Sequence, residues 1–166
     1  LATFLLKGAN SLIIYEKIIL KYPMYEDAYN SLAVIMRILG NQEKSISLYL
    51  KAIKLNPLNH HVYSNLSNLF KARKEYDKAI NACYDAVRAS NRKEAEYFNS
   101  LGILFEKIGE INKAIDSYKM AVKINPKYTK AINNLGVVLY NLKRYEQSAS
   151  VFQMALDIDP NYNEVY

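Results

Sequence analysis

The chain has 166 residues, of which 51% are hydrophobic and 23% charged, and it carries a formal net charge of +6. With only five glycines and four prolines it is unlike a disordered or an all-β chain. No apolar run approaches the roughly 20 residues of a membrane span, so we expect no membrane partner. The chain lacks a starting Met and a signal-peptide pattern, which indicates a piece of a longer protein.

A single cysteine, Cys83, stands among apolar residues. It has no second cysteine with which to form an internal disulfide, so we interpret it as a small buried hydrophobe in a reducing compartment. A cytoplasmic or nucleocytoplasmic location follows as an expectation.

Prolines mark a repeat along the chain. Pro23, Pro57, Pro126 and Pro160 each follow an apolar, Lys-rich or Asp-containing segment, and their spacings are 34, 69 and 34 residues. A period in this range indicates stacked structural units. Each proline predicts the end of a helix, because proline cannot continue the hydrogen-bond ladder.

Alignment on the prolines divides the chain into successive segments. Residues 1–25 are predicted to be part of a preceding unit, with Leu1–Leu6 as the tail of its first helix and GANSLIIYEKIILKYP as its second helix. Four full units follow, and then the start of a further one; these are 26–59, 60–94 with Glu94 as one extra residue, 95–128, 129–162 and 163–166. The polar stretch SNRKE around Asn91 replaces a proline, so we expect a longer turn there.

Small and large residues recur at fixed places within each unit, where place n is the nth residue of the unit. Places 7 and 8 hold leucine followed by a small residue, and places 20 and 27 hold Ala or Ser; an aromatic residue or Ile fills place 4. Small residues let two helices approach closely, and large ones fill the gaps beside them. Each unit therefore predicts two antiparallel helices of about 12–14 residues, joined near place 15, which is Gly40, Lys74, Gly109 or Lys143.

This pattern resembles the tetratricopeptide repeat, and the resemblance covers essentially the whole chain. The usual Trp at place 4 is replaced by Tyr29, Tyr63, Phe98 and Ile132. The resemblance implies an all-α, right-handed superhelical solenoid whose first helices line a concave face. It further implies that places 2, 5, 6, 9, 12 and 13 look into that groove and bind other proteins.

Asparagine is concentrated at those inward places. Seven of the 24 are Asn, whereas 17 Asn in 166 residues predict about two or three. A side-chain amide both donates and accepts, so it can pair with the polar groups of a peptide bond. We therefore predict a groove for an extended polypeptide, bound without regard to side-chain identity, formed by Asn30, Asn65, Asn68, Asn99, Asn133, Asn134 and Asn141 together with Lys130.

Two simpler explanations of the asparagines stay open. In the family, Asn at place 6 can serve hydrogen bonding between repeats. The composition, rich in Lys, Asn, Ile and Tyr, is also typical of an AT-rich genome, which raises Asn everywhere.

No catalytic constellation, phosphate loop or metal-ligand spacing is found, so we expect no enzyme activity, no metal and no cofactor in this chain. His60 and His61 are adjacent, and on a helix their side chains leave about 100° apart, which disfavours a shared metal.

The inward places fit two other binding functions poorly. The clamp by which some tetratricopeptide proteins hold the C-terminal carboxylate of chaperones matches here at only Asn68 and Lys130 of five places. RNA readers need a clearly positive groove. The inward places carry four cationic and three acidic residues, so we expect no nucleic-acid partner.

The phrases PMYEDAYNSLAVI and INNLGVVLY are similar to the arrays of nucleocytoplasmic protein O-glycosyltransferases of the O-GlcNAc and SPINDLY types. That resemblance implies, as an alternative, a substrate-recognition arm, with Asn30, Asn65, Asn99 and Asn134 as its ladder. Repeats cut at both ends also leave apolar faces that could self-associate end to end.

Overall fold

The computed structural model describes the backbone of residues 2–158 and the side chains of residues 11–158, so the segment 163–166, predicted to open a further unit, lies outside it. The described residues form α-helices and no strand, which confirms the all-α class. Two compact units divide the chain, Leu1–Ser90 (the first unit) and Asn91–Tyr166 (the second unit). Each 34-residue repeat of the sequence corresponds to one helix pair within them. The first holds α1 (Ala2–Lys21), α2 (Glu26–Ile38), α3 (Gln42–Leu55), α4 (His60–Ala72) and α5 (Tyr76–Ala89). The second holds α6 (Ala95–Lys107), α7 (Ile111–Ile124), α8 (Thr129–Asn141) and α9 (Tyr145–Ile158).

The N-terminal helix corrects one prediction. Leu1–Leu6 was expected to belong to a different helix from the residues that follow, but α1 is continuous from Ala2 to Lys21. The segment contains no proline between Leu6 and Ser11; its one glycine, Gly8, costs a helix only about 1 kcal/mol, and Asn10 costs less. A break at that point therefore has no local cause.

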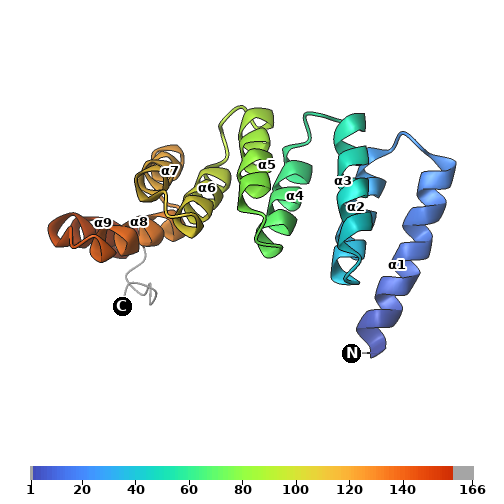
Figure 1. Cartoon of the computed structure of the whole chain (residues 1–166), viewed down its shortest axis with the longest axis horizontal. Coiled ribbons are helices and arrows are strands. Elements are labelled where there is room, and N and C mark those ends of the chain that lie inside the picture. Colours follow the sequence, from blue (N-terminus) through green and yellow to red (C-terminus); the bar gives the residue numbers. More distant parts are fainter. Residues whose placement is uncertain (1, 159–166) are drawn as a thin grey trace. The chain divides into compact units, whose positions relative to one another are not determined.

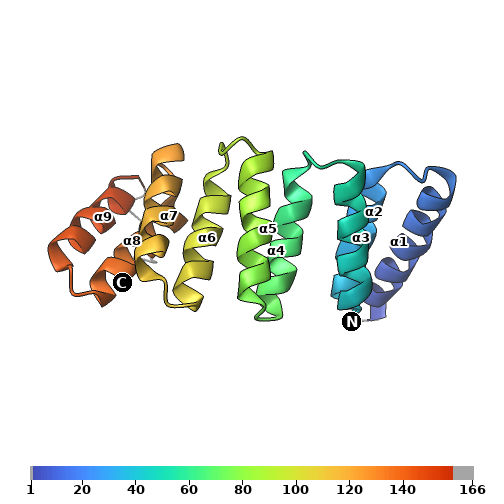
Figure 2. The same cartoon turned by 45° about the horizontal axis from the view of Figure 1, so that its top comes forward.

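From α2 onward the helices form antiparallel pairs of 13 and 14 residues, as the sequence predicts. Figures 1 and 2 show the members of a pair, such as α4 and α5, packed along their whole length. The first helix of each pair ends at place 13, and two residues later, at place 15, the backbone turns left-handed, with positive φ at Gly40 (81°), Lys74 (60°), Gly109 (78°) and Lys143 (61°). The next backbone N–H then reaches back five residues, as from Asn41 to the Met36 carbonyl at 2.9 Å, which caps the helix.

Turns between pairs have two lengths. Four residues join α3 to α4 and α7 to α8, whereas five join α5 to α6. The longer turn contains two consecutive residues of positive φ, Asn91 and Arg92. It stands where the sequence has SNRKE in place of a proline.

Close contact between paired helices depends on places 8 and 20. Serine at either place donates to the backbone carbonyl of the residue at the other: Ser45 to Ala33, Ser67 to Ala79 and Ser148 to Gly136, each at 2.8 Å. All three serines are buried. The hydroxyl is thus satisfied inside the interface, and the small side chain keeps the two backbones close.

The aromatic residue at place 24 fills the space that place 8 leaves. An added Cβ at Gly102 would lie 2.3 Å from Tyr118 Cε1, and one at Gly136 would lie 2.3 Å from Phe152 Cε1. Tyr49 and Tyr118 are the largest fully buried side chains of the described residues. Cys83 occupies the same place in the second pair and is also buried, as predicted.

Candidate peptide-binding surface

The predicted asparagines lie on the first helices of the pairs, α2 and α4 in the first unit and α6 and α8 in the second. Four of them bond to each other. Asn65 Nδ2 donates to Asn30 Oδ1 at 3.1 Å, and Asn134 Nδ2 donates to Asn99 Oδ1 at 2.8 Å. Both bonds span 35 residues, from place 6 of one pair to place 5 of the pair before. Each unit therefore has one amide pair linking its two first helices.

The amide pairs change how the predicted ladder works. Asn30 and Asn99 stand at place 5 rather than 6, and they are the acceptors for the place-6 amides of the following helix pairs. Hydrogen bonding between repeats, the simpler explanation, accounts for half of the eight predicted residues. The bond within each Asn–Asn pair uses one N–H group and one oxygen lone pair. Three N–H groups and one whole carbonyl oxygen of the two amides are therefore not used by this bond.

The four other predicted residues differ in exposure. Asn68, Asn141 and Lys130 are exposed and have no hydrogen bond or ion pair to another described residue. Asn133 is half-buried, and its Oδ1 is covered without a hydrogen-bond partner in the part of the chain that the structure describes. Accessible, unused amides are thus Asn68 beside the pair of the first unit and Asn141 on α8 of the second.

The histidines and acids give no sign of a metal centre. The His60 and His61 rings lie with centroids 4.2 Å apart and tilted by 45°, so they are closer than the expected divergence suggested. Among residues with described side chains, no group of three or more His, Cys, Asp or Glu could hold a metal ion.

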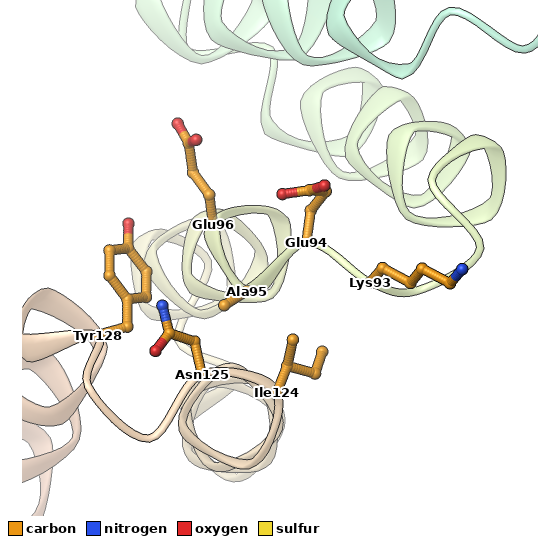
Figure 3. Close-up of a pocket in the computed structure, with 7 residues that line it drawn as sticks. All are labelled: Lys93, Glu94, Ala95, Glu96, Ile124, Asn125 and Tyr128. Atoms are coloured by element: carbon orange, nitrogen blue, oxygen red, sulfur yellow. The ribbon is translucent and has the colours of Figure 1, made fainter.

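A hollow of about 370 Å³ in the second unit was not foreseen from the sequence. It lies between the start of α6 and the α7–α8 turn (Figure 3) and is lined by Lys93, Glu94, Ala95, Glu96, Ile124, Asn125 and Tyr128. In the first unit the place of Ala95 is held by Glu26, whose Oε1 accepts from Asn56 Nδ2 at 2.8 Å. Asn125 matches Asn56, and Ala95 gives it no carboxylate.

The charges around this hollow do not converge on a ligand. Figure 3 shows the carboxylates of Glu94 and Glu96 extending from α6 on the side away from Asn125. Burial, and the nearby Glu96, raise the pKa of Tyr128. We interpret the hollow as the space left by a shorter side chain at place 1.

Two family models of the tetratricopeptide repeat match residues 26–57 and 48–81, and a third matches both 95–128 and 129–162. Together these stretches cover more than half of the chain. The chain belongs to the tetratricopeptide-repeat family. None of these models describes a glycosyltransferase. A search of curated protein sequences found no match.

Solved tetratricopeptide structures share the fold. MamA is 21% identical, with a TM-score of 0.80 over 90% of this chain and 86% of MamA. PilF of Pseudomonas aeruginosa is 18% identical, with a TM-score of 0.80 over 92% of this chain and 71% of PilF. YrrB, described as a tetratricopeptide-repeat protein with an unusual peptide-binding site, is 22% identical, with a TM-score of 0.74 over 91% of this chain and 77% of YrrB. At these identities the likeness establishes the solenoid fold alone.

The structure also bears on membrane insertion. Within the residues that it describes, no helix is both long and apolar enough to cross a bilayer.

Proposed function

We propose that this tetratricopeptide chain is a non-catalytic scaffold that binds an extended polypeptide through the amide-bearing first helices. The observation that carries the proposal is the pairing of Asn30 with Asn65 and of Asn99 with Asn134. Each bond orients two amides, so their remaining donors and acceptors are held in place before a ligand arrives. Preorganised groups lose less entropy on binding.

Exposed Asn68 extends the amide surface of the first unit, and exposed Asn141 lies two turns beyond Asn134 on α8. A bond from each of these to a peptide backbone contributes about 1 kcal/mol net. Four or five such bonds in the whole chain give a weak complex, with a Kd on the order of 10 μM to 1 mM. YrrB, which has the same fold and is described as having a peptide-binding site, is consistent with this class of ligand.

The test uses a 12-residue peptide of Ser, Ala and Gly, titrated into the ¹⁵N-labelled protein while the side-chain amide signals are followed by NMR. We expect the amide signals of Asn68 and Asn141 each to shift with increasing peptide. The double variant Asn68→Ala/Asn141→Ala should bind about thirtyfold more weakly at unchanged stability, because neither amide has a bond to lose in the folded chain.

A matched control comes from the second helices. Asn81 on α5 and Asn112 on α7 are equally exposed and lie on the opposite member of each pair. If Asn81→Ala/Asn112→Ala weakens the peptide as much as the first double variant does, the amides of the first helices are not the binding surface.

Binding in the manner of a glycosyltransferase arm rests only on the phrases quoted from the sequence.

End-to-end self-association has one structural observation in its favour. A hollow of about 330 Å³ between α1 and the α2–α3 pair is lined mainly by apolar side chains, among them Leu20, which is 83% exposed. Light scattering over a range of concentrations tests it: a mass that rises with concentration in the chain but not in Leu20→Glu is expected, and a constant monomer mass excludes it.

A further inference from the structure

Two tyrosines of the second helices point their hydroxyls toward the first helix of the same pair. Tyr49 of α3 and Tyr118 of α7 both stand at place 24 and are fully buried. The Tyr118 hydroxyl donates to Glu106 Oε2 on α6 at 2.5 Å. The Tyr49 hydroxyl is buried and has no hydrogen-bond partner in the described part of the chain. Such a group is expected to have an acceptor, because burial removes the water that would otherwise accept its proton.

The difference arises at place 12, twelve residues before each tyrosine. Glu106 there supplies the acceptor for Tyr118, whereas the first pair has Arg37, whose guanidinium can only donate. Burial raises the pKa of Tyr49, and the nearby Arg37 partly opposes this, so the guanidinium lies close to the hydroxyl. Ser45 is also near, but its own hydroxyl donates to the Ala33 carbonyl, and the Tyr49 hydroxyl forms no hydrogen bond with it. The Tyr49 O–H thus lies near a guanidinium and contacts no acceptor.

A second cation, Lys71, holds on α4 the place that Arg37 holds on α2. The Asn30–Asn65 bond fixes the register of α2 against α4, since both helices run in the same direction. Arg37 lies seven residues after Asn30 and Lys71 six residues after Asn65, so the two cations lie at the same level of neighbouring helices. Packed helices are roughly 8–10 Å apart, which a Lys and an Arg side chain can bridge around one anion.

No acid of this unit neutralises the two cations. Neither Arg37 nor Lys71 forms an ion pair with another described residue, whereas Glu43 and Glu75 are held by Arg73 and Lys78. Asp27 is ten residues before Arg37 on α2, about 15 Å along the helix. Place 12 of the two first helices therefore carries two cations without an acidic partner, and one of them, Arg37, lies near a buried donor that has no acceptor.

We propose that Tyr49, Arg37 and Lys71 form a carboxylate-binding site, which takes an acidic side chain of the extended polypeptide. The inference deepens the proposed function, on which it rests, by naming the ligand: an acidic peptide, oriented on the first unit. Its carboxylate accepts from the Tyr49 hydroxyl as Glu106 does from Tyr118, while Arg37 moves aside and pairs with it. The second unit lacks this site, because its own glutamate fills it.

The binding test compares three dye-labelled peptides by fluorescence anisotropy, identical except for a central Glu, Gln or Lys and amidated at the C-terminus. The Glu peptide is expected to bind at least about fivefold more tightly than the Gln peptide, and the Lys peptide most weakly. Tyr49→Phe should reduce the preference for Glu over Gln and leave the Gln peptide unaffected. Tyr118→Phe, the matched control, should leave the preference intact.

The two proposals fail in different ways. Equal binding of the Glu and Gln peptides, or an unchanged preference in Tyr49→Phe, overturns the carboxylate site and leaves the amide surface standing. A Glu preference that survives Asn68→Ala/Asn141→Ala at full affinity overturns the amide surface instead. A Gln peptide with a free C-terminus that binds as tightly as the amidated Glu peptide shows that a terminal carboxylate is the occupant, which overturns the assignment to a side chain.

A measurement without peptide tests the same geometry. Arg37→Glu places a carboxylate where Glu106 stands in the second unit, so the Tyr49 hydroxyl gains its acceptor. We expect a higher melting temperature in the wild-type background and no gain in the Tyr49→Phe background. An equal change in both backgrounds would mean that the hydroxyl does not face place 12, and the site would be abandoned.

Discussion

Replacing the glycine at place 8 by alanine should have different costs in stability at Gly102 and at Gly136, although the two glycines look alike in sequence. In Gly102→Ala the new Cβ lies 2.3 Å from Tyr118 Cε1, and in Gly136→Ala it lies 2.3 Å from Phe152 Cε1. Carbon atoms need roughly 3.5 Å, so each ring must move by about 1 Å. The two rings differ in freedom: Tyr118 is fully buried and tied to Glu106 by its hydroxyl, whereas Phe152 is half-buried.

The magnitude follows from that difference. Replacing Gly by Ala within a helix favours folding by about 1 kcal/mol. Displacing Tyr118 weakens a hydrogen bond to a charged group, about 1.5–3 kcal/mol, and adds overpacking of about 1–3 kcal/mol. Gly102→Ala should therefore lower the free energy of unfolding by about 2–4 kcal/mol, and Gly136→Ala by less than about 1.5 kcal/mol.

Urea unfolding followed by circular dichroism measures both values, and a double-mutant cycle finds the cause. In a Tyr118→Phe background the ring has no hydroxyl to hold it, so Gly102→Ala should cost less than in the wild type. Equal costs for the two glycine variants, or no coupling to Tyr118→Phe, would refute the reasoning that the hydroxyl fixes the ring.

Three further predictions concern stability. Lys74→Gly and Lys143→Gly should each stabilise the fold by about 0.5–1 kcal/mol, because both lysines have positive φ, which glycine adopts without strain. Lys119→Gly, inside helix α7, should instead cost about 1 kcal/mol, and melting temperatures that change in the same direction for all three variants would contradict this. Glu26→Ala should lower the free energy of unfolding by about 1–2 kcal/mol, because the bond from Asn56 is lost. Asp27, which is exposed and also lies in the first turn of α2, is the control: Asp27→Ala should cost clearly less, and equal costs would show that the bond from Asn56 contributes nothing. Burial, together with Glu106, raises the pKa of Tyr118, so this hydroxyl ionises at a lower pH in the unfolded chain than in the folded one. The stability that it contributes is complete below about pH 10 and falls above that by up to about 1.4 kcal/mol per pH unit. Tyr118→Phe should reduce this slope, and an alkaline unfolding titration that the variant leaves unchanged would disprove the prediction.

The fold could be predicted because its determinants are local and repeated. Prolines, small residues and leucines recur at one spacing, and the helix lengths and the left-handed turns at place 15 follow from them. The break expected after Leu6 was wrong because the boundary came from the repeat pattern, while none of the residues there prevents a helix.

The candidate surface could be predicted only in part. The pattern identified the asparagines, and the family resemblance offered bonding between repeats for those at place 6, but their partners at place 5 were missed, because a bond across 35 residues depends on how two neighbouring pairs stack. The unsatisfied hydroxyl of Tyr49 was missed for a similar reason: in sequence it is one more aromatic residue at place 24. Comparison of places 12 and 24 between repeats, Arg37 with Tyr49 against Glu106 with Tyr118, is the signal that could have found it.

The serine bonds between places 8 and 20 have a consequence for how such repeats diverge. One hydroxyl serves each of three pairs, and it comes from the first helix in Ser67 but from the second in Ser45 and Ser148. The remaining pair, α6 and α7, with Gly102 and Ala114, has none. Drift can therefore move the hydroxyl from one helix to the other through an intermediate that lacks it. In a comparison of related chains we expect the two columns to vary separately while their combination, small with small and at most one serine, persists.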